Sequence, residues 1–402
     1  MIETPPSPMP PTLVSVSVLL LAAMTIMANA TIAPSLPGMK AHFADVPGID
    51  TLTGLILTLP SAAIMLTAGL AGWLADRVSR QALLILAAVL YAVGGSSGLW
   101  AESLTQLLIG RAVLGVGVAF TMTLALAWGA DLWQGPVRAR MMGLQGAFIS
   151  GGGIVVMILG GVLATLHWRG AFSAYLLVLP VTLLAFVMLA PYARRLTARR
   201  ADAAAHPAAA AEPFPWAVFA FVGPLAFLFM AAFYAMPTRM PFLLEGLGVT
   251  NTALVGIIMA TLTMASMPGA LAYGRIRQRL SAMAVFALSF ALMGLGMVVI
   301  SQATGIAGVV IGTVIAGAGM GPSMPNYTTY LMASVPALQR GRASGLLTTA
   351  FFAGQFAAPL LAAPLVHLFG LAGMFEALGF FQIALAGGLA VLAARSRQAA
   401  RA

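Results

Sequence analysis

The side chains able to do chemistry are few in this chain and stand far apart. The 402 residues include no cysteine and four histidines, His42, His167, His206 and His367. These histidines show none of the spacings by which proteins bind metal ions, and without cysteine there is neither a thiolate ligand nor a thiol nucleophile. We therefore expect no metal or other cofactor, no catalytic residues and no enzyme activity.

Two charged side chains inside apolar segments are candidates for proton coupling. Arg111 begins the segment RAVLGVGVA. If this segment is a helix that crosses a lipid bilayer, Arg111 lies roughly 12 Å below the outer surface of the bilayer, at 1.5 Å per residue. A cation at that depth costs at least ~2.5 kcal/mol unless it faces protein or a wet cavity. Arg111 is thus expected either to bind backbone carbonyls or to serve substrate binding and proton coupling. Glu376 is the second candidate for proton coupling, provided that it is buried.

Uncharged polar residues beside glycine and proline are the remaining candidates for binding. The segments ANATIAPSLP, FYAMPTRMPFLL and GAGMGPSMPNYTTYL carry most of them. Pro237 and Pro241 are expected to break one helix near its outer end, and the third segment predicts another broken helix. Instead of binding a ligand, these polar side chains could form hydrogen bonds between helices. Arg239 could instead extend its charged end to the membrane surface. The candidate substrate-binding residues are Asn29, Thr31, Arg111, Tyr234, Arg239, Asn326, Tyr327 and Gln355.

Composition determines the kind of elements that must position these residues. Hydrophobic residues make up 61% of the chain and charged residues only 7%, whereas a water-soluble domain carries about 25% charged residues. Such a chain must fold in a lipid bilayer. The net charge of +10 comes from arginines between apolar runs, which indicates membrane topology and argues against nucleic acid as a partner.

Apolar runs long enough to cross ~30 Å of hydrocarbon number six in each half of the sequence. The spans are predicted at 12–36, 52–74, 81–100, 104–128, 141–163, 170–190, 216–240, 253–273, 282–301, 305–331, 343–365 and 372–393. Between the two sets hydrophobicity collapses. This predicts an N-terminal bundle at 1–192, a cytoplasmic linker at 193–215 and a C-terminal bundle at 216–402.

The two halves carry an internal repeat. Gly115, Gly117, Arg138, Arg140, Gly143 and Gly152 all recur 202 residues later, as Gly317, Gly319, Arg340, Arg342, Gly345 and Gly354. Six coincidences at one offset indicate parallel structural repeats with a cavity at their interface.

The basic residues also predict the orientation. If the N-terminus is cytoplasmic, most of the 20 lysines and arginines fall in inner loops, the linker and the C-terminal tail. That asymmetry predicts a multi-pass protein of the cell inner (plasma) membrane with both termini in the cytoplasm. The first apolar segment is preceded by Glu3 and by no basic residue, so we expect an uncleaved helix and no signal peptide.

Between the second and third spans stands GWLADRVSRQ, residues 72–81. It resembles the loop signature G-x-L-x-D-R-x-G-R-R of the major facilitator superfamily, with Ser79 and Gln81 as departures. The resemblance implies a cytoplasmic latch that holds one conformation against the other half. Its residues would be Gly72, Asp76, Arg77, Arg80 and Asp131; alternatively, Asp76 only solvates a turn.

Two further segments resemble motifs of the same family. Arg111 and Gly115 fit its R-x-x-x-G motif, and the glycines at 143, 152, 160 and 161 fit the frame of its antiporter motif. Val156 and Met157 replace the Gly-Pro pair of that motif, and the first span has Ala30 where many exporters carry an acid. The resemblance implies an all-α membrane protein: twelve transmembrane helices in two parallel six-helix repeats, the major facilitator fold.

The preferred function is that of a secondary active transporter. We expect it to export small amphipathic or drug-like molecules in exchange for protons, by alternating access. The alternative is transport of a small organic anion or metabolite, in either direction, with Arg111 and Arg239 as counter-charges. A remote alternative is a membrane sensor or scaffold that transports nothing. The expected partners are a small-molecule substrate, protons and the lipid bilayer, and the protein is expected to be a monomer.

Overall fold

The computed structural model describes residues 12–133, 135–204, 214–336 and 339–399, and within these ranges every long apolar run is helical. Helices are the expected outcome, because in hydrocarbon each backbone N–H and C=O must find its partner inside the segment. The first half consists of α1 (Thr12–Ala30), the short 3-10 helix η1 (Ala33–Ser35), α2 (Leu36–His42), α3 (Ile49–Arg77), α4 (Arg80–Gly95), α5 (Ser97–Trp100), α6 (Leu104–Leu132), α7 (Gly135–Leu163), the 3-10 helix η2 (Trp168–Leu177) and α8 (Val178–Ala204).

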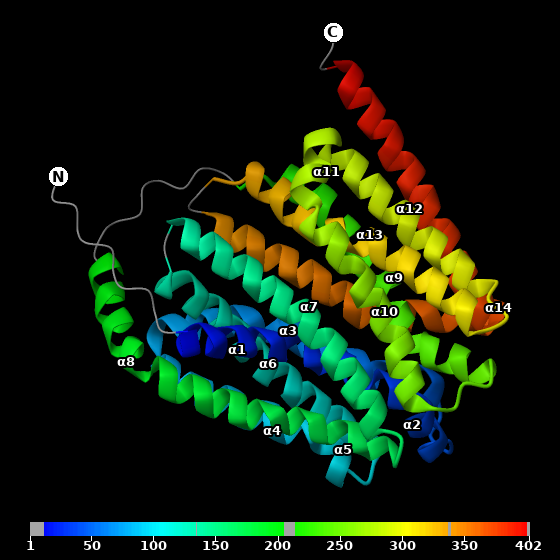
Figure 1. Ribbon diagram of the computed structural model, residues 1–402, viewed down its shortest axis with the longest axis horizontal. Helices are drawn as coiled ribbons and strands as arrows, with labels where there is room; N and C mark the ends of the chain where they lie inside the picture. Colours follow the sequence, from blue (N-terminus) through cyan, green and yellow to red (C-terminus); the bar gives the residue numbers. More distant parts are fainter. Residues whose placement is uncertain (1–11, 134, 205–213, 337–338, 400–402) are drawn as a thin grey trace.

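The second half repeats this arrangement with fewer short helices. It consists of α9 (Trp216–Gly246), α10 (Thr252–Leu271), α11 (Tyr273–Arg279), α12 (Ala282–Ser301), α13 (Ile306–Ala333) and α14 (Arg340–Ala399). Figure 1 shows α1 to α8, in blue to green, as one group and α9 to α14, in green to red, as a second group beside it.

Eleven helices of the described residues are long and apolar enough to cross a membrane. The last of them runs from Arg340 to Arg395, which is enough for two crossings of ~30 Å. It turns at Gly370, whose φ of 72° lies in the left-handed region that glycine adopts readily. The chain therefore makes the twelve crossings that the sequence predicts.

Glycine packing shows that the two halves are structural repeats. On α6, a Cβ added to Gly117 would lie 2.5 Å from the backbone nitrogen of Tyr91 on α4. On α13, a Cβ added to Gly319 would lie 3.0 Å from the backbone nitrogen of Met293 on α12. Both the two glycines and their two partners are 202 residues apart, so the same helix contact is built twice.

Two expectations about proline are wrong. Pro237 and Pro241 lie inside α9, and Pro322 and Pro325 lie inside α13, and both helices continue past them. Each proline removes one backbone hydrogen bond and pushes against the preceding turn, which bends a helix without ending it when the neighbouring bonds survive. The predicted broken helices are therefore continuous, and the cavity is lined by side chains of intact helices.

The predicted linker at 193–215 is partly helical, because α8 continues to Ala204. Residues 205–213 lie outside the described residues. The bounds of the two bundles remain a prediction.

The two halves meet at one end of the bundle and separate at the other. We call the end at which α1 begins and α14 ends the tail side, and the end at which α9 ends and α10 begins the far side. At the far side, a Cβ on Gly161 of α7 would lie 2.5 Å from the backbone oxygen of Thr252 on α10. At the tail side, a groove with about 980 Å³ of empty space, partly open to solvent, separates Gly143 of α7 from Ala270 of α10. The protein is closed at the far side and open at the tail side.

Candidate functional site

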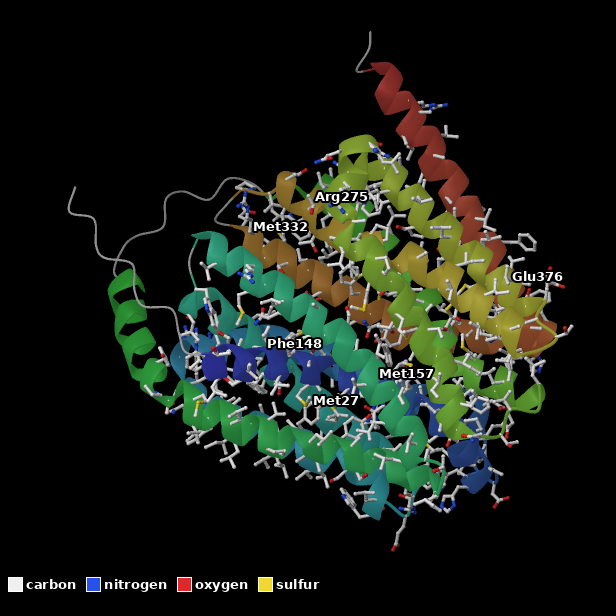
Figure 2. All side chains as sticks on the ribbon, in the orientation of Figure 1. Met27, Phe148, Met157, Arg275, Met332 and Glu376 are labelled. Carbon is white, nitrogen blue, oxygen red and sulfur yellow. The ribbon has the colours of Figure 1, made fainter. Side chains whose placement is uncertain are left out.

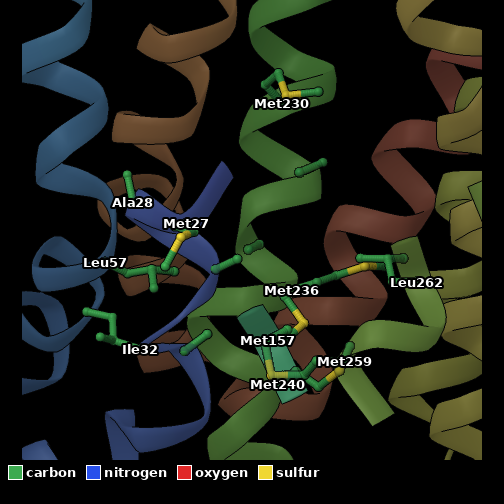
Figure 3. Packing of buried hydrophobic residues seen from close by; sticks show 14 of the residues in the cluster. Met27, Ala28, Ile32, Leu57, Met157, Met230, Met236, Met240, Met259 and Leu262 are labelled. Atoms are coloured by element: carbon green, nitrogen blue, oxygen red, sulfur yellow. The ribbon is translucent and has the colours of Figure 1, made fainter. Parts of the chain in front are cut away.

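A central cavity lies between the halves, above the far-side closure. Its empty space is about 520 Å³, part of it open to solvent, and its walls come from α1, α7, α9 and α10. Most of the wall is soft and apolar: Phe233, Tyr234, Met157, Met236, Met240 and Met259 all line it. Figure 3 shows Met157, Met236, Met240 and Met259 converging from three helices. Flexible thioethers adapt to ligands of varied shape, so this wall suits greasy molecules.

Among the described residues of the wall, one has an amide side chain, Asn29, and it belongs to a polar network that joins the halves. Asn29 of α1 donates from Nδ2 to Ser61 Oγ of α3 at 2.8 Å and to Gln355 Oε1 of α14 at 3.3 Å. Ser61 Oγ donates to the same Gln355 oxygen at 3.0 Å. The predicted residues Asn29, Tyr234 and Gln355 are thus brought together in space, with Asn29 and Tyr234 on the cavity wall.

Arg111 lies outside the cavity, inside the first half. Its side chain is fully buried and donates to the backbone oxygens of Ile56, at 2.7 Å, and Ala28, and to the Tyr175 hydroxyl at 2.9 Å. These bonds tie α6 to α3, α1 and η2. Of the two alternatives drawn from the sequence, the geometry favours carbonyl binding, because the guanidinium is used in holding helices together.

Arg239 belongs to the far-side closure. It is 4% exposed, and its Nη1 donates to the backbone oxygen of Asp50 at 2.9 Å. Lys40 Nζ pairs with Asp50 Oδ1 at 2.5 Å and lies 5.7 Å from the centre of the Phe242 ring. Thr252 Oγ1 donates to the backbone oxygen of Gly161 at 2.8 Å. Polar bonds between the halves thus reinforce the glycine contact at this end.

Three of the predicted binding residues are used in packing. The Thr31 hydroxyl donates to the backbone oxygen of Met27. Asn326 is fully buried, donates to the backbone oxygen of Ala282 at 3.0 Å and accepts from Tyr273. The Tyr327 hydroxyl donates to the backbone oxygen of Leu225 at 2.9 Å. The structure does not bring these three side chains to the wall of the central cavity.

Glu376 lies away from the cavity as well. Figure 2 shows it at the edge of the molecule, whereas Met27 and Met157 lie near the middle. Its side chain is half-buried on α14.

The predicted latch residues gather at the tail side within the first half. Arg80 Nη2 pairs with Asp131 Oδ2 at 2.5 Å, and the Arg80 guanidinium lies 5.0 Å from the Trp128 ring. Arg77 is exposed and stacks on Trp73 at 4.1 Å. Nothing lies within 4 Å of a Cβ built on Gly72. The side chain of Asp76 lies outside the described residues. In this conformation the described latch contacts all lie within the first half, and those of Arg80 join α4 to α6.

Sequence reasoning did not single out Ser61 or Tyr175. Ser61 follows Pro60 in the second span, and a serine beside a proline in an apolar run was an available signal. Tyr175 could not be found, because nothing in the sequence places it beside Arg111.

Comparison with known proteins agrees with the fold. The sequence profile of the Major Facilitator Superfamily matches residues 18–359. The backbone resembles the crystal structure of the nucleoside transporter NupG, with a TM-score of 0.72, 11% identity and coverage of 94% of this chain and 98% of the other. It also resembles a bacterial homologue of the lysosomal transporter Spinster in inward-facing conformation, with a TM-score of 0.68, 16% identity and 95% of each chain covered.

Curated relatives match shorter stretches. Myo-inositol transporter 2 of Schizosaccharomyces pombe is 28% identical over 121 residues, which cover 30% of this chain and 22% of that protein. The multidrug transporter protein MdtP of Bacillus subtilis is 26% identical over 157 residues, or 38% of this chain and 28% of that protein. The matches thus span about a quarter of the relatives' length.

The family match and the long apolar helices define a multi-pass membrane protein of the transporter class. The chain belongs to the Major Facilitator Superfamily.

Proposed function

We propose that this transporter exports small amphipathic or drug-like molecules through the central cavity. The observation that carries the proposal is the cavity wall, in which four methionines and two aromatic side chains surround a single amide. A wall of this kind stabilises apolar surface without demanding one ligand shape. A site for a highly hydroxylated molecule would need many more hydrogen-bonding groups than this wall carries.

The way in which the halves touch supports alternating access. The far side is closed by glycine contacts and by the bonds of Arg239 and Thr252, whereas the tail side is open between α7 and α10. A ligand in the central cavity would then exchange with the tail side in this conformation. A rocking motion about the cavity would open the far side and close the groove.

Orientation and direction are parts of the same proposal. We propose that the protein lies in the inner (plasma) membrane of the cell. Both termini are then in the cytoplasm, because the basic residues cluster at the tail side. The conformation described is then inward-open and would load substrate from the cytoplasm, as export requires. We further propose that the protein works as a monomer.

Proton exchange is the proposed driving reaction. The described residues that line the cavity include no carboxylate, so a proton would have to act through a group outside it. Glu376 is the candidate from the sequence, and its distance from the cavity means that coupling would proceed through helix movement.

Transport of a small organic anion is the second candidate. It is favoured by Arg239, whose Nε and Nη2 are buried and have no hydrogen-bond partner among the described residues. Arg111, the other counter-charge, is occupied by backbone oxygens. The described residues of the cavity wall include no cation, so amphipathic cargo is favoured.

Transport in inside-out membrane vesicles tests the proposal. Vesicles containing the full-length protein should accumulate fluorescent amphipathic dyes when a pH gradient is imposed, and a protonophore at fixed membrane potential should abolish the accumulation. Met259→Ala, which enlarges the cavity, should change the relative transport rates of different dyes several-fold. Met264→Ala is the matched control, because Met264 lies on the same helix but is 54% exposed, and it should transport as the wild type does.

Two results would contradict the proposal. Movement of benzoate or another carboxylate without movement of any dye would favour the anion transporter. Dye transport that ignores the protonophore would retain export of amphipathic molecules and reject proton exchange.

A further inference from the structure

One oxygen atom in the wall of the central cavity lacks a partner. Asn29 is 6% exposed, and its Oδ1 receives no hydrogen bond from any described residue. A buried amide oxygen without a hydrogen-bond donor lowers the stability of the folded protein, because the oxygen has lost its bonds to water without gaining a new partner. Since Asn29 lines the cavity, a molecule bound there can supply the missing donor.

The surrounding hydrogen bonds decide which end of the Asn29 amide is available. Gln355 Nε2 faces the Met230 sulfur at 3.8 Å, and a thioether sulfur only accepts. Gln355 Oε1 must therefore point toward Asn29 and Ser61, where it accepts from Ser61 Oγ at 3.0 Å. The Ser61 oxygen in turn accepts from Asn29 Nδ2 at 2.8 Å. Since the Met230 sulfur orients the whole chain of bonds, Asn29 Nδ2 is used inside the protein and Oδ1 is left for a ligand.

The charge of the wall restricts the donor further. The described residues that line the cavity are all uncharged. An ammonium group buried there would lose its hydration without meeting a carboxylate, at a cost that a neutral donor does not have. A neutral hydroxyl or amide N–H therefore fits this oxygen better than a cation does.

A second polar group lies in the same part of the wall. Tyr234 of α9 lines the same cavity as Asn29 of α1. A ligand hydroxyl that donates to Asn29 Oδ1 could accept from the Tyr234 hydroxyl, so that both of its hydrogen-bonding roles are satisfied.

We propose that Asn29 Oδ1 makes the cavity selective for amphipathic molecules that present a neutral hydrogen-bond donor. The donor binds at Asn29, and the apolar body lies among the methionines at 157, 236, 240 and 259. This inference rests on the proposed function and adds the chemical class of its substrate. An ether of the same shape as a favoured alcohol would leave the Asn29 oxygen unpaired and would bind more weakly.

Matched alcohol and ether pairs test the inference on the purified full-length protein. The probes are 1-naphthol with 1-methoxynaphthalene and 2-naphthol with 2-methoxynaphthalene, each measured by competition against tritiated 1-naphthol and by direct titration. The wild type should bind each naphthol at least about fivefold more tightly than its ether. Asn29→Leu should bring this ratio close to one while binding the ethers about as well as before, which also shows that the variant is folded.

Ser61→Ala is the matched control. It removes a member of the same network that does not line the cavity, and it leaves Asn29 Nδ2 its bond to Gln355. This variant should keep the preference for the naphthols. Should Asn29→Leu fail to fold, Asn29→Ala removes the same oxygen with a smaller side chain and should show the same loss of preference.

The inference is overturned if the wild type binds each naphthol and its ether equally, if it binds none of the naphthols, or if the Asn29 variants keep the preference. The vesicle experiment is read separately. Dye export without any preference for donors would retain the proposed function and reject the role of Asn29. A clear preference without export would retain the site and reject the proposed direction of transport.

Discussion

Arg111 holds three segments of the first half together from the middle of the bundle. Its guanidinium reaches backbone oxygens at the end of α1 and in α3, and a hydroxyl in η2. Hydrogen bonds from a charged donor are stronger than neutral ones, and a buried carbonyl that loses its donor is left unpaired. Arg111 is therefore expected to contribute to the stability of the fold more than to substrate binding.

Replacing Arg111 by leucine should therefore destabilise the protein by about 2 to 5 kcal/mol. Thermal unfolding of the purified protein in detergent would show this as a lower midpoint and a lower yield of monodisperse protein. Tyr175→Phe removes only the hydroxyl that meets Arg111 and Ala28 and should cost about 1 kcal/mol. A stable Arg111→Leu protein that loses affinity only for carboxylates would instead assign this side chain to an anion site.

At the scale of the helix, α7 and α10 decide which end of the cavity is open. Gly161 and Gly256 let the two backbones touch at the far side: a Cβ on Gly256 would lie 2.6 Å from the backbone oxygen of Met157. At the tail side of α7, Gly143 and Gly146 have nothing within 4 Å of an added Cβ. Glycine thus permits close approach at one end in this conformation and leaves room for it at the other.

Gly161→Val should force α7 and α10 apart at the far side and favour the conformation that is closed at the tail side. The absence of cysteine from the natural chain allows a clean measurement with Ser150→Cys, which lines the tail-side groove. In the Gly161→Val background this thiol should react with a maleimide several-fold more slowly. Gly143→Val is the opposite test, since a side chain there should hinder closure of the groove and keep the thiol reactive. Equal rates in both backgrounds would show that these glycines do not control the conformation.

At the scale of the whole molecule, the distribution of arginine predicts how the protein sits in its membrane. The tail side carries exposed Arg77 and Arg275, whereas exposed Glu102 lies at the far side, between α5 and α6. With the tail side in the cytoplasm, the molecule follows the positive-inside rule.

Labelling of intact cells by a membrane-impermeant maleimide checks this orientation. Glu102→Cys should be labelled from outside, and Arg275→Cys only after the membrane is permeabilised, because basic loops are retained in the cytoplasm. The reverse pattern would invert the molecule. The open groove would then face outward, and the proposed direction of loading would be wrong.

The two halves also explain why a small change at one end can act at the other. The repeated glycine contacts make each half a packed unit, as Gly117 on Tyr91 and Gly319 on Met293 illustrate. Packed units move as rigid bodies more easily than they deform. In the proposed alternating-access motion, opening of the groove and closure at the far side would be two results of one rotation about the central cavity.

The sequence alone determined the spans, their number and the repeat. Those features follow from the length of apolar runs and from an offset of 202 residues, and both are properties of the chain read in one dimension. The sequence also identified Asn29 and Tyr234 as binding candidates. The sequence-based prediction overestimated the effect of the prolines on α9 and α13. A proline in the sequence indicates a missing backbone hydrogen bond, but it does not show how well the neighbouring turns compensate for that loss.

Only the tertiary structure decided which polar groups face the cavity. Arg111, Asn326 and Asn29 all look alike in sequence, as polar residues within apolar helices. Successive residues of a helix point in different directions around its axis. Which of these directions meets the other half depends on how the twelve helices pack. That packing directs Arg111 and Asn326 to backbone oxygens and leaves the Oδ1 atom of Asn29 at the cavity.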